Sequence, residues 1–268
     1  MDLQSLFGLE GRVALVTGGS RGIGKMIVEG LLAAGAARVY ICARKKEQVD
    51  ATSAELGDKV IGLVADLSQM DGIKALADEI AAREDKLDIL VNNAGAAWGE
   101  PFTEFSEAGW HRTMDLNVKT PFFLTQKLYP LLKAAGTVDR PSKVLMIASI
   151  DGMKSNPWPT YPYQASKAGL IHMTRRMAAE LAKDNIIVNG IGPGAFPSDM
   201  NRAARDNAEA SARGIPSGRV GVTEDMAAGA IYLLSRAGDY VVGTTIPIDG
   251  GVVNANIGAG NFVDPSGQ

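Results

Sequence analysis

A tyrosine and a lysine stand one helical turn apart in the second half of the chain. Tyr163 and Lys167 occupy positions i and i+4 of a segment that we expect to be helical, so both side chains lie on one face. The ordinary pKa of a tyrosine is about 10, too high for efficient proton exchange at neutral pH. A cation one turn away favours the phenolate, so we expect Lys167 to lower the pKa of Tyr163. The pair therefore predicts a proton donor.

A second tyrosine, Tyr161, has to be distinguished from this pair. It would point to another side of the helix or lie before its first turn, and Pro159 and Pro162 favour a place before the helix. Only Tyr163 has a lysine four residues later, so the pattern selects Tyr163. Because a Tyr-x-x-x-Lys pattern is common by chance, the alternative is a surface tyrosine without a chemical role.

A glycine-rich turn stands between the first expected strand, residues 12–17, and the first expected helix, residues 23–34. In this order, backbone N–H groups and the positive end of the helix dipole face a pyrophosphate. Gly18 permits the turn, Gly22 leaves room for the phosphates, and Gly24 allows the helix to pack closely on the strand. The alternative is a glycine turn without a ligand, but the strand–turn–helix order favours dinucleotide binding.

These residues are positioned by a regular alternation of strand and helix patterns. Strands are expected at residues 12–17, 38–42, 60–64, 87–91, 143–148, 186–191 and 244–248. Helices are expected at residues 23–34, 47–56, 73–83, 110–132, 163–183 and 224–235, the fourth with a break near Pro121. The alternation predicts an α/β fold, a Rossmann-type doubly wound seven-stranded parallel sheet with helices on both faces.

Two segments fall outside this alternation. Residues 193–222 are long and polar, and we expect short helices there that form a substrate lid over the site. The tail, residues 252–268, is glycine-rich and lacks periodicity, so we expect it to be mobile unless a partner subunit holds it. No linker interrupts the chain, which predicts a single domain over residues 1–268.

The spacing of the glycine turn is specific. Three residues separate Gly18 from Gly22, where the common dinucleotide fingerprint has one. In this Thr-Gly-x-x-x-Gly-x-Gly form the chain resembles the short-chain dehydrogenase/reductase family of the classical type. Further motifs extend the resemblance over nearly the whole chain: Asn92-Asn93-Ala94-Gly95, Pro193-Gly194 and Asp249-Gly250-Gly251.

The resemblance implies a catalytic set of four residues. Ser149, at the end of the fifth strand, matches a serine that hydrogen-bonds the substrate carbonyl. Asn117 matches a helix-borne asparagine that links the lysine to a chain of water. In this scheme Tyr163 donates the proton, and Lys167 also binds the nicotinamide ribose. NADPH delivers the hydride, and the protein supplies orientation and electrostatics.

The end of the second strand predicts which nicotinamide cofactor is used. A carboxylate there would bind the ribose hydroxyls and repel a 2′-phosphate. Ala43 stands where the NAD-preferring members of the family tend to carry aspartate, and Arg44 follows it. Arg44 can form a charge-assisted fork with a phosphate, and Arg21 lies in the glycine turn beside the same place. We expect NADPH/NADP+ as the cofactor, the alternative being that Arg44 is a solvated charge.

The resemblance also implies the remaining cofactor contacts. Asp66 and Leu67 should border the adenine, and Ser198 stands where many relatives carry a threonine that hydrogen-bonds the nicotinamide carboxamide. The expected cofactor-binding residues are Gly18, Ser20, Arg21, Gly22, Ile23, Gly24, Arg44, Asp66, Leu67, Asn93, Ala94, Gly95, Tyr163, Lys167, Pro193, Gly194, Phe196 and Ser198.

Within the family the chain is similar to NADPH-dependent β-ketoacyl reductases associated with rhamnolipid synthesis. This implies reduction of a ketone, with a 3-oxoacyl thioester as one substrate class. Aromatic, cyclic or steroid-like ketones and their alcohols, and a non-catalytic NADP-binding sensor, are the alternatives. Trp98, Trp158 and Phe196 suggest an apolar cavity or plain packing. The tyrosine helix ends in Lys183-Asp184 where carrier-dependent relatives show arginines, so docking of a carrier protein stays open.

Composition bears on partners and location. The chain of 268 residues has a net charge of −3, which gives no electrostatic reason to expect nucleic acid or an acidic membrane as partner. No apolar run approaches the ~18 residues of a membrane span. The single cysteine, Cys42, cannot form an internal disulfide. We expect a cytoplasmic protein without a metal site that acts on a small-molecule carbonyl substrate. The resemblance also implies a homo-oligomer, namely a tetramer in which subunits pair through long helices at residues 121–132 and 170–182.

Overall fold

Seven short apolar segments form one sheet in the computed structural model, which describes residues 1–255. All strands are parallel and follow the order β3-β2-β1-β4-β5-β6-β7. They are β1 (Val13–Thr17), β2 (Arg38–Ala43), β3 (Val60–Val64), β4 (Ile89–Asn92), β5 (Ser142–Ile147), β6 (Ile186–Pro193) and β7 (Thr245–Ile248). The predicted parallel sheet is confirmed. Of the expected tail, residues 256–268 lie outside the described residues.

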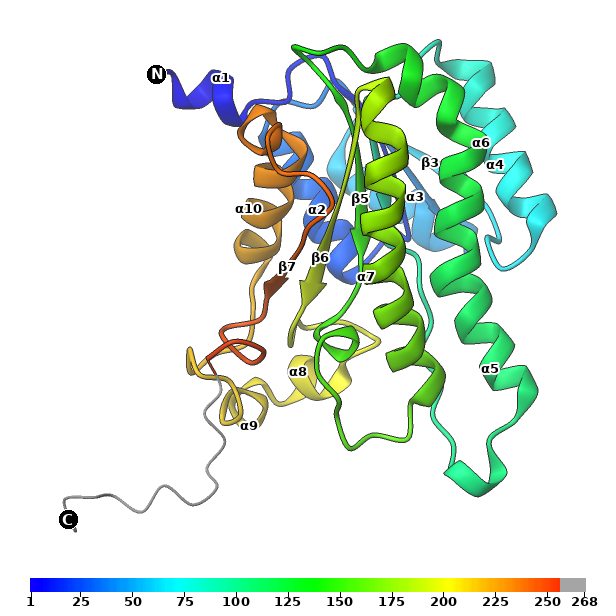
Figure 1. Cartoon of the computed structure of the whole chain (residues 1–268), viewed down its shortest axis with the longest axis vertical. Helices are drawn as coiled ribbons and strands as arrows, with labels where there is room; N and C mark the ends of the chain where they lie inside the picture. Colours follow the sequence, from blue (N-terminus) through cyan, green and yellow to red (C-terminus); the bar gives the residue numbers. More distant parts are fainter. Residues whose placement is uncertain (256–268) are drawn as a thin grey trace.

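Helices cover both faces of the sheet, as predicted (Figure 1). One face packs on α2 (Gly22–Ala33), α3 (Lys46–Leu56) and α10 (Thr223–Leu234). The other packs on α4 (Met70–Arg83), α6 (Thr120–Ala135) and α7 (Tyr161–Leu181). Successive strand residues alternate between the two cores because strand side chains point to opposite faces. In β1, Val16 joins the first core and Leu15 the second.

The predicted break near Pro121 is wrong. Helix α5 (Glu107–Met114) leads through a π-helical turn, Asp115–Lys119, directly into α6. Pro121 lies in the first turn of α6, where the wider turn before it accommodates a residue that lacks a backbone N–H. The chain therefore stays helical through the position at which the sequence suggested an interruption.

Short elements lie at the two ends of the sheet. Helix α1 (Leu3–Phe7), which was not expected from the sequence, lies near the N-terminus. The expected short helices of residues 193–222 are α8 (Arg202–Asp206) and α9 (Ala208–Ala212). Strands β6 and β7 run toward α8 and α9, so these helices lie at the carboxyl edge of the sheet (Figure 1).

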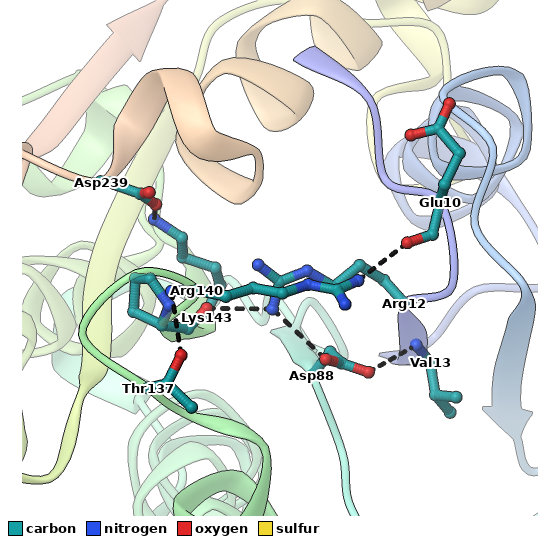
Figure 2. Close-up of polar contacts among 9 residues, drawn as sticks. Glu10, Arg12, Val13, Asp88, Thr137, Arg140, Lys143 and Asp239 are labelled. Carbon is teal, nitrogen blue, oxygen red and sulfur yellow. Dashed lines mark hydrogen bonds and ion pairs between the residues drawn. The ribbon is translucent and has the colours of Figure 1, made fainter. Parts of the chain in front are cut away.

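Buried charged residues form ion pairs at the opposite edge of the sheet, where the strands begin (Figure 2). The Arg12 guanidinium lies 3.3 Å from the carboxylate of Asp88, which also accepts the backbone N–H of Val13 at 2.9 Å. Lys143 at the start of β5 is 1% exposed and its amine lies 2.6 Å from Asp239. Burial lowers the pKa of Lys143, and the Asp239 carboxylate opposes that effect. The first pair joins the starts of β1 and β4, and Arg12 also donates to the Pro141 carbonyl just before β5 at 3.0 Å. The second pair joins the start of β5 to the turn after α10.

Within residues 1–255, no helix is both long and apolar enough to span a membrane. The same residues contain no cluster of three or more His, Cys, Asp or Glu side chains arranged to hold a metal ion.

Candidate active site

The site begins where the strand order reverses, between β1 and β4. The Thr17 hydroxyl donates to the Val91 carbonyl at 3.2 Å and accepts the N–H groups of Asn93 and Ala94, each at 2.9 Å. The Asn93 side-chain amide donates to the carbonyls of Thr17 at 2.8 Å and Gly18 at 3.2 Å. The carboxyl ends of the two strands are thus locked together at the switch point, where open α/β sheets bind ligands.

The glycine turn fits a dinucleotide pyrophosphate. Gly18 and Gly22 have φ of 65° and 52°, in the left-handed region that favours glycine. A Cβ on Gly24 would lie 2.2 Å from the Gly18 carbonyl oxygen, so α2 packs directly on the turn. Arg21, the residue before α2, provides no side-chain cap, and the first turn of α2 has no acidic residue. The backbone N–H groups of the first turn of α2 are therefore available to bind an anion.

Other predicted cofactor residues surround this turn. Ser20 is buried, and its carbonyl accepts the Thr52 hydroxyl at 2.8 Å. Asp66 is exposed at the end of β3, and a hydrogen bond from the Ser68 N–H lowers the pKa of its carboxyl, assisted by the nearby charge of Arg44. Leu67 is buried beside it. Arg44 and Asp66 therefore lie close together at the ends of neighbouring strands.

The segment after β6 approaches the glycine turn. A Cβ on Gly22 would lie 3.2 Å from the Cβ of Ser198, whose hydroxyl accepts the Asn201 N–H at 3.1 Å. At the end of β6, Gly194 packs on Asp249, which leaves no room for a side chain. Phe196 is 2% exposed and packs on Gly221 inside this segment. The predicted cofactor contact of Phe196 stays a prediction.

Asn117 lies in the π-helical turn and is 1% exposed. Its side-chain oxygen accepts the Ala96 N–H at 2.8 Å, and its amide donates to the Ala96 carbonyl at 2.9 Å. The same amide donates to the Ser166 hydroxyl at 2.9 Å, and Ser166 donates to the Tyr163 carbonyl at 2.7 Å. Asn117 thus connects the segment after β4 with the start of α7.

Lys167 is buried one turn after Tyr163. Its amine donates to the Ile147 carbonyl at 2.7 Å and lies 5.6 Å from the centre of the Tyr163 ring. A Cβ on Gly95 would lie 3.7 Å from this amine, so the Asn93–Gly95 segment reaches the same place. Burial lowers the pKa of Lys167 to about 8, and the negative charge of Asp151 opposes that effect.

Tyr163 is half-buried beside Ser149. Burial raises the pKa of Tyr163 to about 12, the Ser149 hydroxyl acts in the opposite direction, and Asp151 raises the pKa further. The expectation that Lys167 lowers the pKa of Tyr163 is wrong, because the cost of burying a phenolate dominates and the amine is directed to Ile147. A phenol with this pKa stays protonated at neutral pH.

Tyr161 is the first residue of α7, so its predicted place before the helix is wrong. Proline is tolerated in a first helical turn, and Pro162 therefore does not displace the helix start. The Tyr161 ring makes edge-on contacts with Phe102 at 5.6 Å and Phe105 at 5.8 Å between ring centres. These rings and Trp110 line a pocket of about 200 Å³.

The predicted aromatic residues are not gathered around one cavity. Trp98 packs on Gly109, stacks under the Arg112 guanidinium at 4.8 Å and donates to Glu100 at 2.6 Å. Trp158 is 68% exposed, and Phe196 packs within its own segment. The contacts of Trp98 and Phe196 are therefore those of plain packing, which was the alternative to an apolar cavity.

Four residues near the site were missed as contributors in the sequence analysis. Thr17 joins β1 to β4, Ser166 joins Asn117 to α7, and Asp151 affects the pKa of Lys167. Asp199 contacts Arg21, which was expected beside Arg44. Asp151, two residues after Ser149, and Ser166, inside the Tyr-x-x-x-Lys motif, carried a positional signal, whereas Asp199 carried none.

The chain is similar to a family model and to known proteins over most of its length. The family model described as short chain dehydrogenase matches residues 12–209. The rhamnolipids biosynthesis 3-oxoacyl-[acyl-carrier-protein] reductase of Pseudomonas aeruginosa is 45% identical over 91% of this chain and 97% of its own length. The 2-dehydro-3-deoxy-D-gluconate 5-dehydrogenase of Escherichia coli is 39% identical over 92% and 97%.

Solved structures are similar over the same extent. The active-site complex of Pseudomonas aeruginosa RhlG with NADP has a TM-score of 0.89 at 45% identity, covering 93% of this chain and 99% of that one. A gluconate 5-dehydrogenase from Burkholderia cenocepacia, in complex with NADP and tartrate, has a TM-score of 0.86 at 33% identity, covering 95% and 100%.

Proposed function

Because the chain belongs to the short-chain dehydrogenase family, we propose that it reduces a ketone to a secondary alcohol with NADPH. The observation that carries this proposal is the gathering of Ser149, Tyr163 and Lys167 at the carboxyl edge of the sheet, beside the glycine turn. NADPH held at the turn would supply the hydride. Reduction is the direction that a protonated tyrosine serves directly.

Ser149 and Tyr163 polarise the substrate carbonyl. Both hydroxyls can donate to its oxygen, which stabilises the negative charge that develops there. Tyr163, whose pKa burial raises to about 12, then transfers its proton to the more basic alkoxide. The ammonium of Lys167 stabilises the phenolate that remains, and Asn117 holds the start of α7 in place through Ser166.

The cofactor would be held by groups at the ends of four strands. The free N–H groups of the first turn of α2 would bind the pyrophosphate, because the helix dipole favours an anion there. Arg44 would bind the 2′-phosphate, since Ala43 leaves no carboxylate to repel it. Asp66 would border the adenine, and Ser198 the carboxamide.

A 3-oxoacyl thioester is the substrate class that we propose. The support is the 45% identity to a relative whose name specifies a 3-oxoacyl reductase, together with further relatives of that name at 33% and 35%. Relatives named as gluconate dehydrogenases make a polar keto acid the second candidate. The test is a rate panel with NADPH that includes 3-oxoacyl thioesters, keto acids, aromatic ketones and steroids. Thioester turnover well above the others is expected, and turnover of keto acids alone would contradict this assignment.

A homotetramer in the cytoplasm is the proposed working form. Exposed aromatic residues lie along the α5–α7 side of the molecule, namely Phe102, Trp110, Phe122 and Tyr161. A second copy would cover this apolar surface. Light scattering tests the proposal, and a monomer or a dimer at working concentrations would contradict it. Cys42, the single cysteine, is buried and cannot form an internal disulfide, which suits a reducing compartment.

A further inference from the structure

One carboxylate of the segment after β6 bridges two arginines. Asp199 forms an ion pair with Arg21 in the glycine turn through one oxygen. Its other oxygen lies 2.6 Å from the guanidinium of Arg205 in α8. About half of each side chain is exposed, so the contacts are accessible to solvent and to ligands. The ion pair to Arg21 joins residues that are 178 positions apart.

This ion pair spans the approach to the first turn of α2. Arg21 is the residue directly before α2, and Ser198, the neighbour of Asp199, faces Gly22 at its first position. The N–H groups that suit a pyrophosphate therefore lie beside the Arg21–Asp199 contact. One Asp199 oxygen contacts one terminal nitrogen of the Arg21 guanidinium, so a phosphate that binds this end of the guanidinium through two N–H groups has to displace that oxygen.

We propose that Asp199 competes with the cofactor 2′-phosphate for Arg21 and thereby tunes the affinity for NADP+ and NADPH. The proposal rests on the use of NADPH proposed above. A phosphate carries more negative charge than a carboxylate and displaces Asp199 when the cofactor binds. When NADP+ leaves, Asp199 takes Arg21 back, which favours release of the product cofactor. NAD+ has no 2′-phosphate and leaves the Arg21–Asp199 pair intact.

The experiment measures dissociation constants of the full chain for NADP+ and NAD+ in wild type and Asp199→Asn. Adenosine 2′,5′-bisphosphate and adenosine 5′-monophosphate repeat the comparison without the nicotinamide, which separates the phosphate effect from contacts of Ser198. An exposed ion pair is worth about 0.2–1 kcal/mol, which corresponds to roughly a 1.4- to 5-fold change. NADP+ and the bisphosphate should bind more tightly by such a factor, and NAD+ and the monophosphate should be unchanged.

Two controls make this result specific. Asp206→Asn removes the carboxylate that pairs with Arg205 at 2.7 Å but does not touch Arg21, and it should leave all four dissociation constants unchanged. In an Arg21→Ala background, Asp199→Asn should have no effect on NADP+. Equal tightening of NAD+ and NADP+, or unchanged or weaker NADP+ binding, would overturn the proposal. A wild type that binds NAD+ as tightly as NADP+ would instead refute the proposed use of NADPH.

Discussion

The amine of Lys167 donates a hydrogen bond to the carbonyl oxygen of Ile147 at 2.7 Å. This bond holds the ammonium at the end of β5, where it lies 5.6 Å from the centre of the Tyr163 ring. The lysine therefore stands beside the phenol without determining its resting protonation, which burial governs. Its charge gains importance once Tyr163 has given up its proton, because a buried phenolate needs a counter-charge.

Reduction should lose rate as the pH rises through about 8. Burial disfavours the charged form and lowers the pKa of Lys167 to about 8, so the ammonium is present below that pH and lost above it. Tyr163, with its pKa raised to about 12, keeps its proton throughout this range. A profile of kcat/KM against pH with saturating NADPH measures the effect. Lys167→Arg keeps its charge and should remove the decline, whereas a wild-type profile flat through pH 8 contradicts this role.

Arg44→Ala should weaken NADPH binding selectively. A hydrogen bond to a charged group contributes about 1.5–3 kcal/mol, so the dissociation constant for NADPH should rise about 10- to 150-fold. NADH, which lacks the 2′-phosphate, should bind as it does to the wild type. Titration of both cofactors by protein fluorescence tests this, with Lys45→Ala as a neighbouring control. Equal weakening of both cofactors would assign Arg44 a purely structural role.

Asn117→Ala should destabilise the fold as well as the site. The substitution removes the partner of the part-buried N–H and carbonyl of Ala96 and one of the two partners of the buried Ser166 hydroxyl. Each unsatisfied buried group costs about 1–3 kcal/mol, so the free energy of unfolding should fall by at least that amount. Urea denaturation measures it. Asn207→Ala, which removes the cap of an exposed helix start, is the control and should cost about 0.5–2 kcal/mol. A loss under about 1 kcal/mol for Asn117→Ala would contradict this role of Asn117.

Asp88→Ala should destabilise the protein without a direct effect on chemistry. Asp88 is 1% exposed and carries the charge that balances the buried Arg12 (Figure 2). Removing one partner of a buried ion pair costs about 3–5 kcal/mol. The free energy of unfolding in urea should fall by this amount, while kcat below the unfolding transition stays close to wild type. A loss under about 1 kcal/mol would show that the pair is not important for stability.

The sheet and the glycine turn could be predicted because their signals are local. Apolar runs of strand length alternate with helical patterns. Gly18 and Gly22 are needed for their positive φ angles and Gly24 for close packing, and the motif that contains them is visible in the sequence. The Tyr163 and Lys167 pair follows from helical spacing alone. Each of these inferences requires only residues that are close together in the chain.

The remaining features depend on contacts between distant segments. The pKa of Tyr163 is set by burial, which no spacing reveals, and Lys167 is drawn to Ile147 by the packing of α7 on β5. The Arg21–Asp199 pair joins the glycine turn to a polar segment without periodicity. The π-helical turn that carries Asn117 has no recognisable sequence pattern, and Pro121 therefore suggested a break instead.

The rate of NADPH oxidation by Tyr163→Phe tests the central claim most directly. The substitution removes only the hydroxyl, so NADPH should bind with nearly the wild-type dissociation constant. Loss of a general acid costs about 10²–10⁴ in rate, and turnover of a ketone that the wild type reduces should fall at least that far. Tyr161→Phe, at the tyrosine whose ring packs on Phe102, should keep wild-type turnover. Appreciable reduction by Tyr163→Phe would contradict the assignment of Tyr163 as the proton donor.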